Sequence, residues 1–225
     1  MGYPVTFVIV GSGPSLTPAD VAACRGRARV IVVNDSYMMA PWADYLYARD
    51  YDWWVSKPTY YDKPQHEATH FVFEGERWTG SQIASQTFSL RYVQTRSALG
   101  LCPIPGVIHD GKEGANSGYQ AINLAIHFGA RRILLLGFDM GATGRGHWFG
   151  AHPTPLTNVE ANEYGVFARV FDSMTDDLRN MGIEVVNCTR KSAITCFRCS
   201  TIEQELHGPD QGDGLQNAGV SGFLN

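Results

Sequence analysis

The segment VTFVIVGSGPSL, residues 5–16, constrains the fold of this chain more than any other. Its run of β-branched and aromatic residues from Val5 to Val10 stops abruptly at glycine, serine and proline. This pattern predicts a buried strand at 5–10, a tight turn, and a helix at about 18–24. Glycines let the backbone approach a ligand closely, and free N–H groups at a strand–turn–helix junction suit a phosphate.

A second apolar strand, predicted at 29–34, ends in Asn34 and Asp35. This pair follows the turn by about 20 residues, where a doubly wound fold places a polar residue on the ribose or base of a nucleotide. We therefore expect residues 1–36 to form a nucleotide-binding βαβ half. An ordinary βα turn, whose glycines serve packing alone, is the alternative that the sequence leaves open.

The turn differs from the two common phosphate-binding motifs. Leu16 occupies the position of the third glycine of the dinucleotide fingerprint, and no Gly-Lys-Ser/Thr of a Walker loop follows. A hydride-transfer cofactor and an ATPase motor are therefore disfavoured. A short turn that contacts one or two phosphates is expected instead, with a stiffening proline and a serine hydroxyl. Its predicted nucleotide-binding residues are Gly11, Ser12, Gly13, Pro14 and Ser15.

The length of the chain suits a single α/β domain, and its composition is typical of globular proteins. It has 225 residues, of which 44% are hydrophobic and 18% charged, with a net charge of −4. Residues 1–207 suit one domain with an ample core, and the Gly-, Asp-, Gln- and Asn-rich segment 208–225 predicts a flexible tail. Basic runs are too short for an extensive nucleic-acid contact, and apolar runs are too short for a membrane span. Five cysteines and an N-terminal strand in place of a signal peptide favour a cytoplasmic protein.

Strands and helices alternate along the rest of the chain. Alternation of this kind predicts a Rossmann-like α/β fold, with a mostly parallel sheet and helices on both faces. Residues near 57–115 and 139–158 lack a clear period and predict lid-like insertions, with short strands and loops in 74–115. The further predicted strands are 43–48, 69–73, 132–136 and 183–187, and the further predicted helices are 116–128 and 160–181.

Polar residues follow several of the predicted strands. Ligands of parallel α/β sheets bind at the carboxyl ends of the strands, so these side chains predict one shared cleft. Asp50 follows the third strand, where it can orient a ligand hydroxyl or a catalytic histidine, or else cap a helix. The polar residues at predicted strand ends are Ser12, Asn34, Asp35, Asp50, Asp139 and Asn187.

Other signals have more than one interpretation each. Cys196-Phe-Arg-Cys199 with Cys188 is compatible with a zinc site, but unpaired core thiols are favoured. The tryptophans at 42, 53 and 54 suit either a stacked ligand or the core. His147 and His152 suit a base or phosphate contact, ordinary loop positions, or a metal with Asp139.

The order of the motifs is Gly-x-Gly-Pro-Ser-Leu, a strand ending in asparagine, a helix opened by Ser-Gly, a strand ending in Gly-Phe-Asp, and a His-rich loop. As scattered motifs over about residues 5–190, it resembles the bacterial sialyltransferases that use CMP-sialic acid. A looser resemblance links it to archaeal 6-hydroxymethylpterin pyrophosphokinases. Residues 43–54 also resemble a segment of uncharacterised proteins of tailed bacteriophages.

The sialyltransferase resemblance implies a Rossmann-like fold, no metal, and a histidine base. Asn34 matches a nucleotide contact, and Ser117 with Gly118 matches the helix start that faces the donor. Asp139 belongs to the segment that matches Gly-Phe-Asp. Tyr119 and Tyr164 are candidates for the family's tyrosines that bind the departing phosphate.

The stretch His147-Trp-Phe-Gly-Ala-His152 resembles the family's base-carrying segment with one extra residue. His147 is its first match, and His152 is the second candidate for the base. With Asp50, these histidines are the predicted catalytic residues.

We therefore expect a metal-independent glycosyltransferase-like enzyme whose donor is a nucleotide-sugar and which needs no further cofactor. One alternative is diphosphate transfer from ATP, in which Asp35, Asp50 and Asp139 converge on magnesium. Another is a non-catalytic phage accessory protein that binds a nucleotide. The chain is compatible with a homo-oligomer. If a phage encodes it, the expected location is the host cytoplasm. The sequence does not indicate the acceptor.

Overall fold

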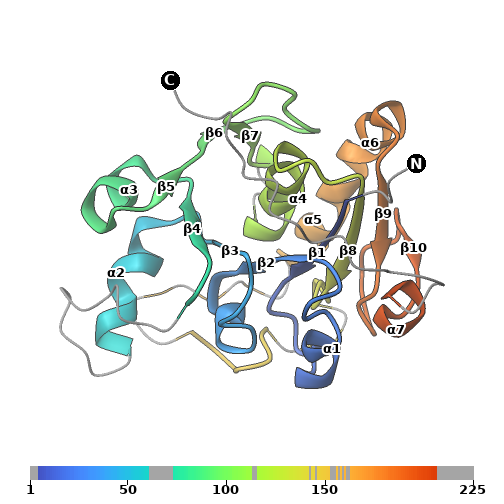
Figure 1. Ribbon diagram of the computed structural model, residues 1–225, viewed down its shortest axis with the longest axis horizontal. Coiled ribbons are helices and arrows are strands. Elements are labelled where there is room, and N and C mark those ends of the chain that lie inside the picture. Colours follow the sequence, from blue (N-terminus) through green and yellow to red (C-terminus); the bar gives the residue numbers. More distant parts are fainter. Residues whose placement is uncertain are drawn as a thin grey trace.

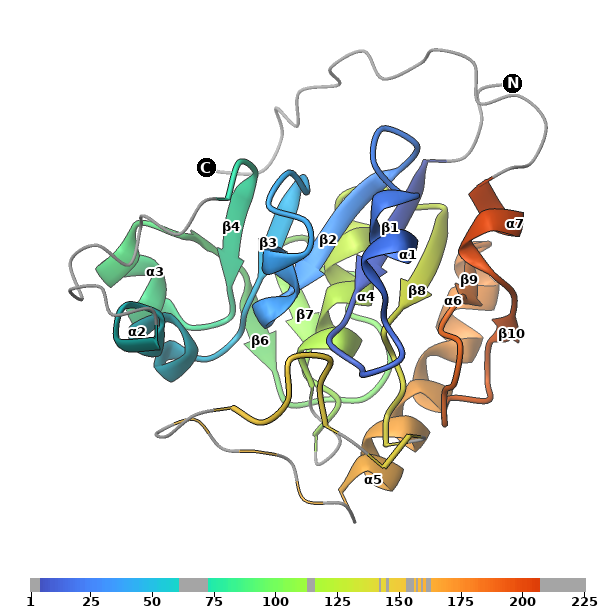
Figure 2. The same cartoon turned by 90° about the horizontal axis from the view of Figure 1, so that it is seen from below.

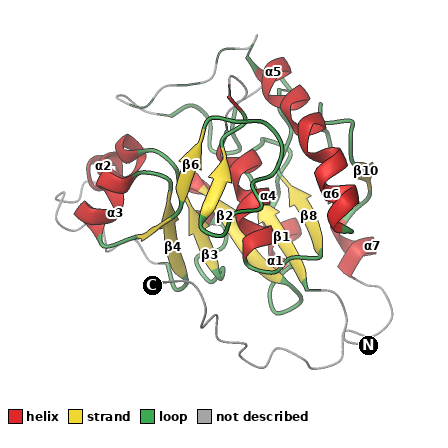
Figure 3. Ribbon diagram, turned by 90° about the horizontal axis from the view of Figure 1, so that it is seen from above, coloured by secondary structure: helices red, strands yellow, loops and turns green. Residues whose placement is uncertain are grey.

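A computed structural model describes residues 5–60, 73–112, 116–141, 143–144, 146–152, 156, 158, 160 and 163–206. Within these residues, eight parallel strands form the main sheet in the order β10-β9-β8-β1-β2-β3-β4-β5 (Figure 3). The predicted α/β fold with a parallel sheet is confirmed. The strands are β1 (Thr6–Val10), β2 (Arg29–Val33), β3 (Tyr45–Tyr47), β4 (Glu76–Thr79), β5 (Arg91–Tyr92), β8 (Arg132–Leu136), β9 (Glu184–Asn187) and β10 (Arg198–Cys199).

The strand β1 lies in the middle of the sheet and is buried along its length. Val8 pairs with Val30 of β2 on one side and with Leu134 of β8 on the other. Parallel sheets carry helices on both faces, so their central strands are apolar in continuous runs. This burial explains why the run of β-branched residues is such a strong signal in the sequence.

Helices cover both faces of the sheet. Figure 1 shows α4 and α6 above the sheet and α1 and α7 below it. Alternate residues of β1 serve the two layers, because Phe7 and Ile9 join the core on the α4 side while Val8 and Val10 join the core on the α1 side. The helices are α1 (Pro18–Ala22), α2 (Tyr51–Tyr60), α3 (Gln82–Phe88), α4 (Ser117–His127), α5 (Tyr164–Arg169), α6 (Thr175–Met181) and α7 (Ile202–Leu206), with 3-10 helices η1 (Asn34–Met38) and η4 (Val170–Met174).

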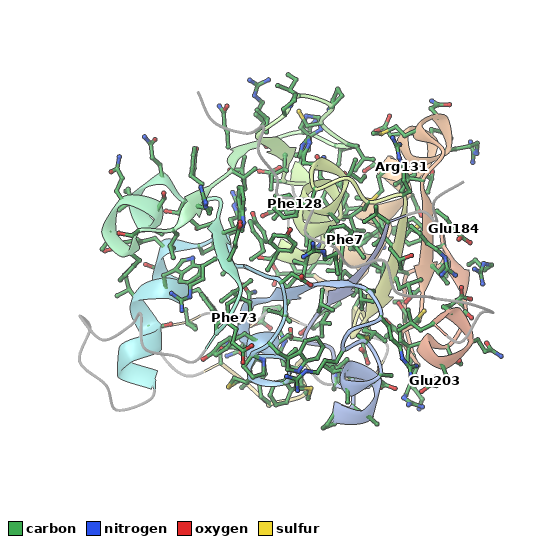
Figure 4. All side chains as sticks on the ribbon, in the orientation of Figure 1. Phe7, Phe73, Phe128, Arg131, Glu184 and Glu203 are labelled. Atoms are coloured by element: carbon green, nitrogen blue, oxygen red, sulfur yellow. The ribbon has the colours of Figure 1, made fainter. Side chains whose placement is uncertain are left out.

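A cluster of aromatic rings fixes the far end of α4 on the sheet. Phe128, directly after the helix, stacks on Tyr45 with ring centroids 4.4 Å apart, and Tyr45 stacks on Phe7 at 6.2 Å. Figure 4 shows Phe7 and Phe128 close together in the centre of the molecule. Because this end of α4 is held, its N-terminus is directed to the opposite edge of the sheet, where the strands end.

The predicted helix at 160–181 is not continuous. Its first described helical residue is Tyr164, and a 3-10 segment, η4, separates α5 from α6. Ser173 donates to the carbonyl of Val170 and Thr175 donates to that of Asp172, at 2.7 and 2.8 Å. Such side-chain bonds to nearby carbonyls compete with regular helix geometry, which is the physical reason for the break.

Residues 76–109 hold short strands, as the sequence predicts. Two of them, β4 and β5, extend the main sheet, and β6 (Gln94–Arg96) pairs with β7 (Val107–His109) in a separate two-stranded sheet. This part of the expected insertion is built into the fold. The predicted strand at 69–73 falls almost entirely outside the described residues, as does the predicted tail at 208–225.

The predicted strand at 183–187 is not the last strand of the sheet, because β10 pairs with β9 and adds one more edge strand. Cys196 and Cys199 are both unpaired, as predicted, and Cys196 is half-buried against the core; the placement of Cys199 in the core is wrong, because this residue is exposed. All cysteines of the described residues are free thiols. Trp53 and Trp54 are buried, as the core interpretation of these tryptophans predicts.

The carboxyl ends of the strands face one edge of the sheet. Figure 2 shows the gold segment after β8 crossing this edge, where residues 146–152 lie. In the part of the chain that is described, no helix has the length and apolar character needed to cross a membrane.

Candidate functional site

A cavity of about 480 Å³ opens at the carboxyl ends of β1, β2, β3 and β8. Segments that are far apart in the sequence form its wall, as the polar residues at several strand ends predict. The residues used below that line it are Gly11, Ser12, Gly13, Asn34, Arg49, Asp50, Trp53, Asn116, Ser117, Gly118, Gln120, Met140, His147, His152 and Tyr164.

The turn after β1 is docked on the end of β8. The N–H groups of Gly11 and Gly13 donate to the carbonyls of Leu136 and Gly137, each at 2.7 Å. A Cβ on Gly13 would lie 1.9 Å from a carboxylate oxygen of Asp139, and a Cβ on Gly11 would lie 2.7 Å from the Gly137 carbonyl oxygen. Packing against the neighbouring strand end therefore requires these glycines whether or not a ligand is bound.

Asp139 lies behind the turn and is 1% exposed. Its Oδ1 accepts the backbone N–H of Ser15 at 2.9 Å, and burial raises the pKa of its carboxyl group above the ordinary value. Asp139, Pro14 and Ser15 are not part of the cavity wall, whereas Gly11, Ser12 and Gly13 are. Asp139 thus holds the turn in place from behind.

Two residues at the strand ends have left-handed backbones. Asn34 follows β2 with φ of 50°, and Met140 follows β8 with φ of 47°. Asparagine tolerates this conformation, but it is uncommon for a residue as bulky as methionine. Both residues line the cavity, and backbone strain of this kind concentrates at functional sites.

The His-rich loop is bound to the turn, because the N–H of Trp148 donates to the carbonyl of Ser12 at 2.9 Å. The hydroxyl of Ser12 and Nδ1 of His147 form a hydrogen bond of 2.8 Å. The rings of His147 and His152 are 4.6 Å apart between centroids. Both predicted histidines therefore meet at the cavity wall.

Asp35 stands behind His152. Its carboxylate is 1% exposed, lies 3.6 Å from Nδ1 of His152, and accepts the indole N–H of Trp53 at 3.2 Å. Asp35 is not part of the cavity wall, so its predicted role as a direct nucleotide contact is not what this geometry favours. Ser12, His147 and His152 instead form a row of polar groups at the wall, and Asp35 stands behind its last member.

The imidazole of His147 is a weak base in this setting. Burial is the main cause that lowers its pKa to about 4, and the neighbouring His152 lowers it further, while Asp35 and the Ser12 contact act in the opposite direction. His147 is therefore neutral at pH 7.

The helix α4 begins at the cavity. Asn116 caps it by accepting the N–H of Tyr119 at 2.8 Å, and Asn116, Ser117 and Gly118 line the wall. A Cβ on Gly118 would lie 2.7 Å from the ring of Phe138, so glycine allows the helix to start this close to the end of β8. The N-terminus of a helix carries a partial positive charge and favours anions.

The carboxylates of the magnesium alternative do not converge. Asp50 lines the cavity with a side chain that is 71% exposed, whereas Asp35 and Asp139 are buried behind the wall at separate places. Across the described ranges, no group of three or more His, Cys, Asp or Glu side chains suits a metal ion. The three aspartates named for that reaction therefore do not form a metal site.

Of the two tyrosine candidates, only Tyr164 lines the cavity. Tyr119 is fully buried, and its hydroxyl donates to the carbonyl of Gly100 at 3.0 Å, so it belongs to the core. Sequence reasoning missed Arg49 and Gln120. Arg49 follows a predicted strand directly, which is a usable signal, but nothing in the sequence distinguishes Gln120 from a surface position on its helix.

No protein-family model matches this chain, and no curated protein or solved structure matches it.

Replacing Gly13 with Ala should destabilise the protein by about 1–3 kcal/mol, the usual cost of overpacking, because the new Cβ meets Asp139. The double variant G13A/D139A should lose less unfolding free energy than the two single variants lose in total, since one partner of the clash is gone. Urea unfolding measures all three. Gly165→Ala in α5 is the control, with no loss of stability expected; additive effects of the first pair would contradict the predicted contact.

The lowered pKa of His147 predicts a loss of stability in acid. The unfolded chain binds a proton near pH 6.5 and the folded chain near pH 4, so the unfolding free energy falls as pH drops between these values. His147→Asn keeps a polar atom for Ser12 and removes the titration. Urea unfolding between pH 7 and 4.5 should show a shallower fall for the variant, and parallel curves would contradict the assignment.

Proposed function

We propose that this chain binds a nucleotide, in the form of a nucleotide-sugar, in the cavity and transfers the sugar to a hydroxyl acceptor without a metal ion. One observation carries the proposal. Two imidazoles, one of them backed by a buried carboxylate, line the same 480 Å³ cavity as the N-terminus of α4. The arrangement combines a group that accepts a proton with a place for an anionic leaving group.

The anionic part of the ligand fits the α4 end of the cavity. A helix N-terminus presents free N–H groups and a partial positive charge, which stabilise phosphate. Ser117 and Gly118 begin this helix, and the turn Gly11–Gly13 faces the same space. Asn34 lines the cavity at the end of β2, where a base or ribose would lie in a doubly wound fold.

His152 is the better candidate for the base, although the sequence motif favours His147. A general base works best when its pKa is near the working pH, and the pKa of His147 is about 4. Asp35 faces Nδ1 of His152 at 3.6 Å. A carboxylate in this position orients the imidazole.

The reaction is then an ordinary displacement at the sugar carbon. Nε2 of His152 takes the proton of the acceptor hydroxyl, whose oxygen forms the new bond to the sugar. The bond to the phosphate oxygen breaks, and the nucleotide leaves with the electron pair. The partial positive charge at the start of α4 stabilises the charge that develops on this phosphate.

A thermal-shift series tests the binding step. CMP, UDP, GDP, ATP and their sugar conjugates are compared at equal concentration, and at least one should raise the melting temperature, increasingly with its concentration. The shift should survive excess EDTA. A shift that EDTA abolishes and magnesium restores would favour diphosphate transfer, and no shift with any of them would overturn the proposal.

Variants of the two histidines and of Asp35 test the chemical step, with release of nucleotide from the stabilising donor as the assay. His152→Gln should lower turnover by about 10²–10⁴ while nucleotide binding persists. Asp35→Asn should also lower turnover while nucleotide binding persists, because the imidazole of His152 loses the carboxylate that orients it. His147→Asn should cost less than His152→Gln; the reverse order would assign the base to His147, and wild-type rates in all variants would exclude both.

A further inference from the structure

Gln120 is a buried amide that lacks one of its hydrogen bonds. It lies on α4 with 0% exposure and lines the cavity. Its Oε1 accepts the hydroxyl of Tyr47 at 2.6 Å. Its Nε2 has no hydrogen-bond partner among the described residues. Buried polar groups in folded proteins are nearly always paired, so this nitrogen points to a partner that the chain itself does not supply.

Tyr47 determines which end of the amide is left over. Its hydroxyl is the donor of the bond to Oε1, and burial keeps this proton in place because it raises the pKa of the hydroxyl far above the ordinary value. The carbonyl end of Gln120 is therefore used by Tyr47, and the NH₂ end is left to donate. A donor that is fixed in this way is selective for an acceptor group of a ligand.

Arg49 brings a positive charge to the same place. It follows Tyr47 by two residues and lines the cavity. A Cβ on Gly80 would touch both the Tyr47 hydroxyl, at 3.1 Å, and Cγ of Arg49, at 3.2 Å, so the two side chains are neighbours. The guanidinium also lies 3.7 Å from a carboxylate oxygen of Asp110 and 4.0 Å from one of Asp50. A guanidinium has five N–H donors, so that of Arg49 can contact both carboxylates and still donate to an oxygen of a ligand.

We propose that Gln120 and Arg49, with the start of α4, form a subsite for an anionic oxygen group of the ligand. Nε2 of Gln120 and the guanidinium of Arg49 each donate to an oxygen of this group, and Tyr47 is the residue that positions Gln120. Phosphate and carboxylate share the required chemistry. The inference rests on the proposed function only in taking the cavity as the ligand site, and it names the residues that recognise the charged part.

The test uses small anions, so that it does not depend on the nucleotide or sugar. Inorganic pyrophosphate and malonate are titrated while the melting temperature of the protein is followed. One of them should stabilise the wild type in a concentration-dependent way. Stabilisation by pyrophosphate assigns the subsite to phosphate, and stabilisation by malonate alone assigns it to carboxylate.

Two variants locate the effect. In Y47F/Q120M both members of the buried pair become apolar, so the melting temperature without anion should equal or exceed that of the wild type, while the apparent anion affinity falls about tenfold or more. Arg49→Gln should weaken the anion in the same way without unfolding the protein. Arg179→Gln makes the same charge change on an exposed side chain of α6 and should leave the anion affinity unchanged.

Each outcome of these titrations either supports or overturns the proposed subsite. An anion effect that both site variants retain in full would overturn the proposal, because the anion then binds elsewhere. A double variant that melts well below the wild type would show that Gln120 is needed for structure alone, provided that Arg49→Gln also retains the anion effect. No stabilisation of the wild type by either anion overturns the subsite. A positive anion result with no nucleotide binding would retain the subsite and reject the proposed function.

Discussion

The contact between the turn after β1 and the end of β8 is the interaction on which the rest of the site depends. Two backbone hydrogen bonds of 2.7 Å join the turn to the neighbouring strand end, and the Asp139 carboxylate holds the Ser15 N–H from behind. Only glycine fits at position 13, because Asp139 occupies the space of a side chain. The turn in turn binds the His-rich loop through the carbonyl of Ser12. A change at the β1–β8 junction is therefore transmitted to both histidines.

The cavity is built from buried polar groups with different neighbours. Asp35 has an indole N–H and an imidazole beside it, and Asp139 has a backbone N–H. Gln120 has the Tyr47 hydroxyl on one end and no partner from the described chain on the other. A vacant buried donor lowers stability until a ligand supplies the acceptor. Oδ2 of Asp139 also has no hydrogen-bond partner among the described residues, but Asp139 lies behind the cavity wall, whereas Gln120 is part of the wall. Position at the wall therefore separates the supporting carboxylates from the amide that is proposed to bind.

Local sequence signals predicted much of the fold. β1, β2 and β8 are apolar runs because both faces of a central parallel strand are buried, and α4 shows its cap and its stop within a few residues. The two-residue strand β10 escaped prediction, and β5 was expected only as one of several short strands without bounds, because edge pairing leaves almost no pattern in so short a segment. The break at η4 escaped because Ser173 and Thr175 fit the polar positions of a regular helix in the sequence, whereas in the structure their hydroxyls donate to carbonyls three residues earlier.

The sequence by itself determined which strand ends carry polar residues, and the ends of β1, β2, β3 and β8 do meet at one cavity because parallel strands share an edge. Asn187, at the end of β9, is an exception, because it is fully buried and is not part of the cavity wall. Ser12, Asn34, Ser117, His147 and His152 line the cavity. Only the tertiary structure decided which of the predicted side chains face the cavity. Asp35 and Asp139 follow their strands as Asn34 does, yet both are turned behind the wall, because a neighbouring backbone or ring supplies their hydrogen bonds. Gln120 looks like any polar helix residue until Tyr47 of a distant strand lies against it, since burial and pairing depend on contacts that no local pattern contains.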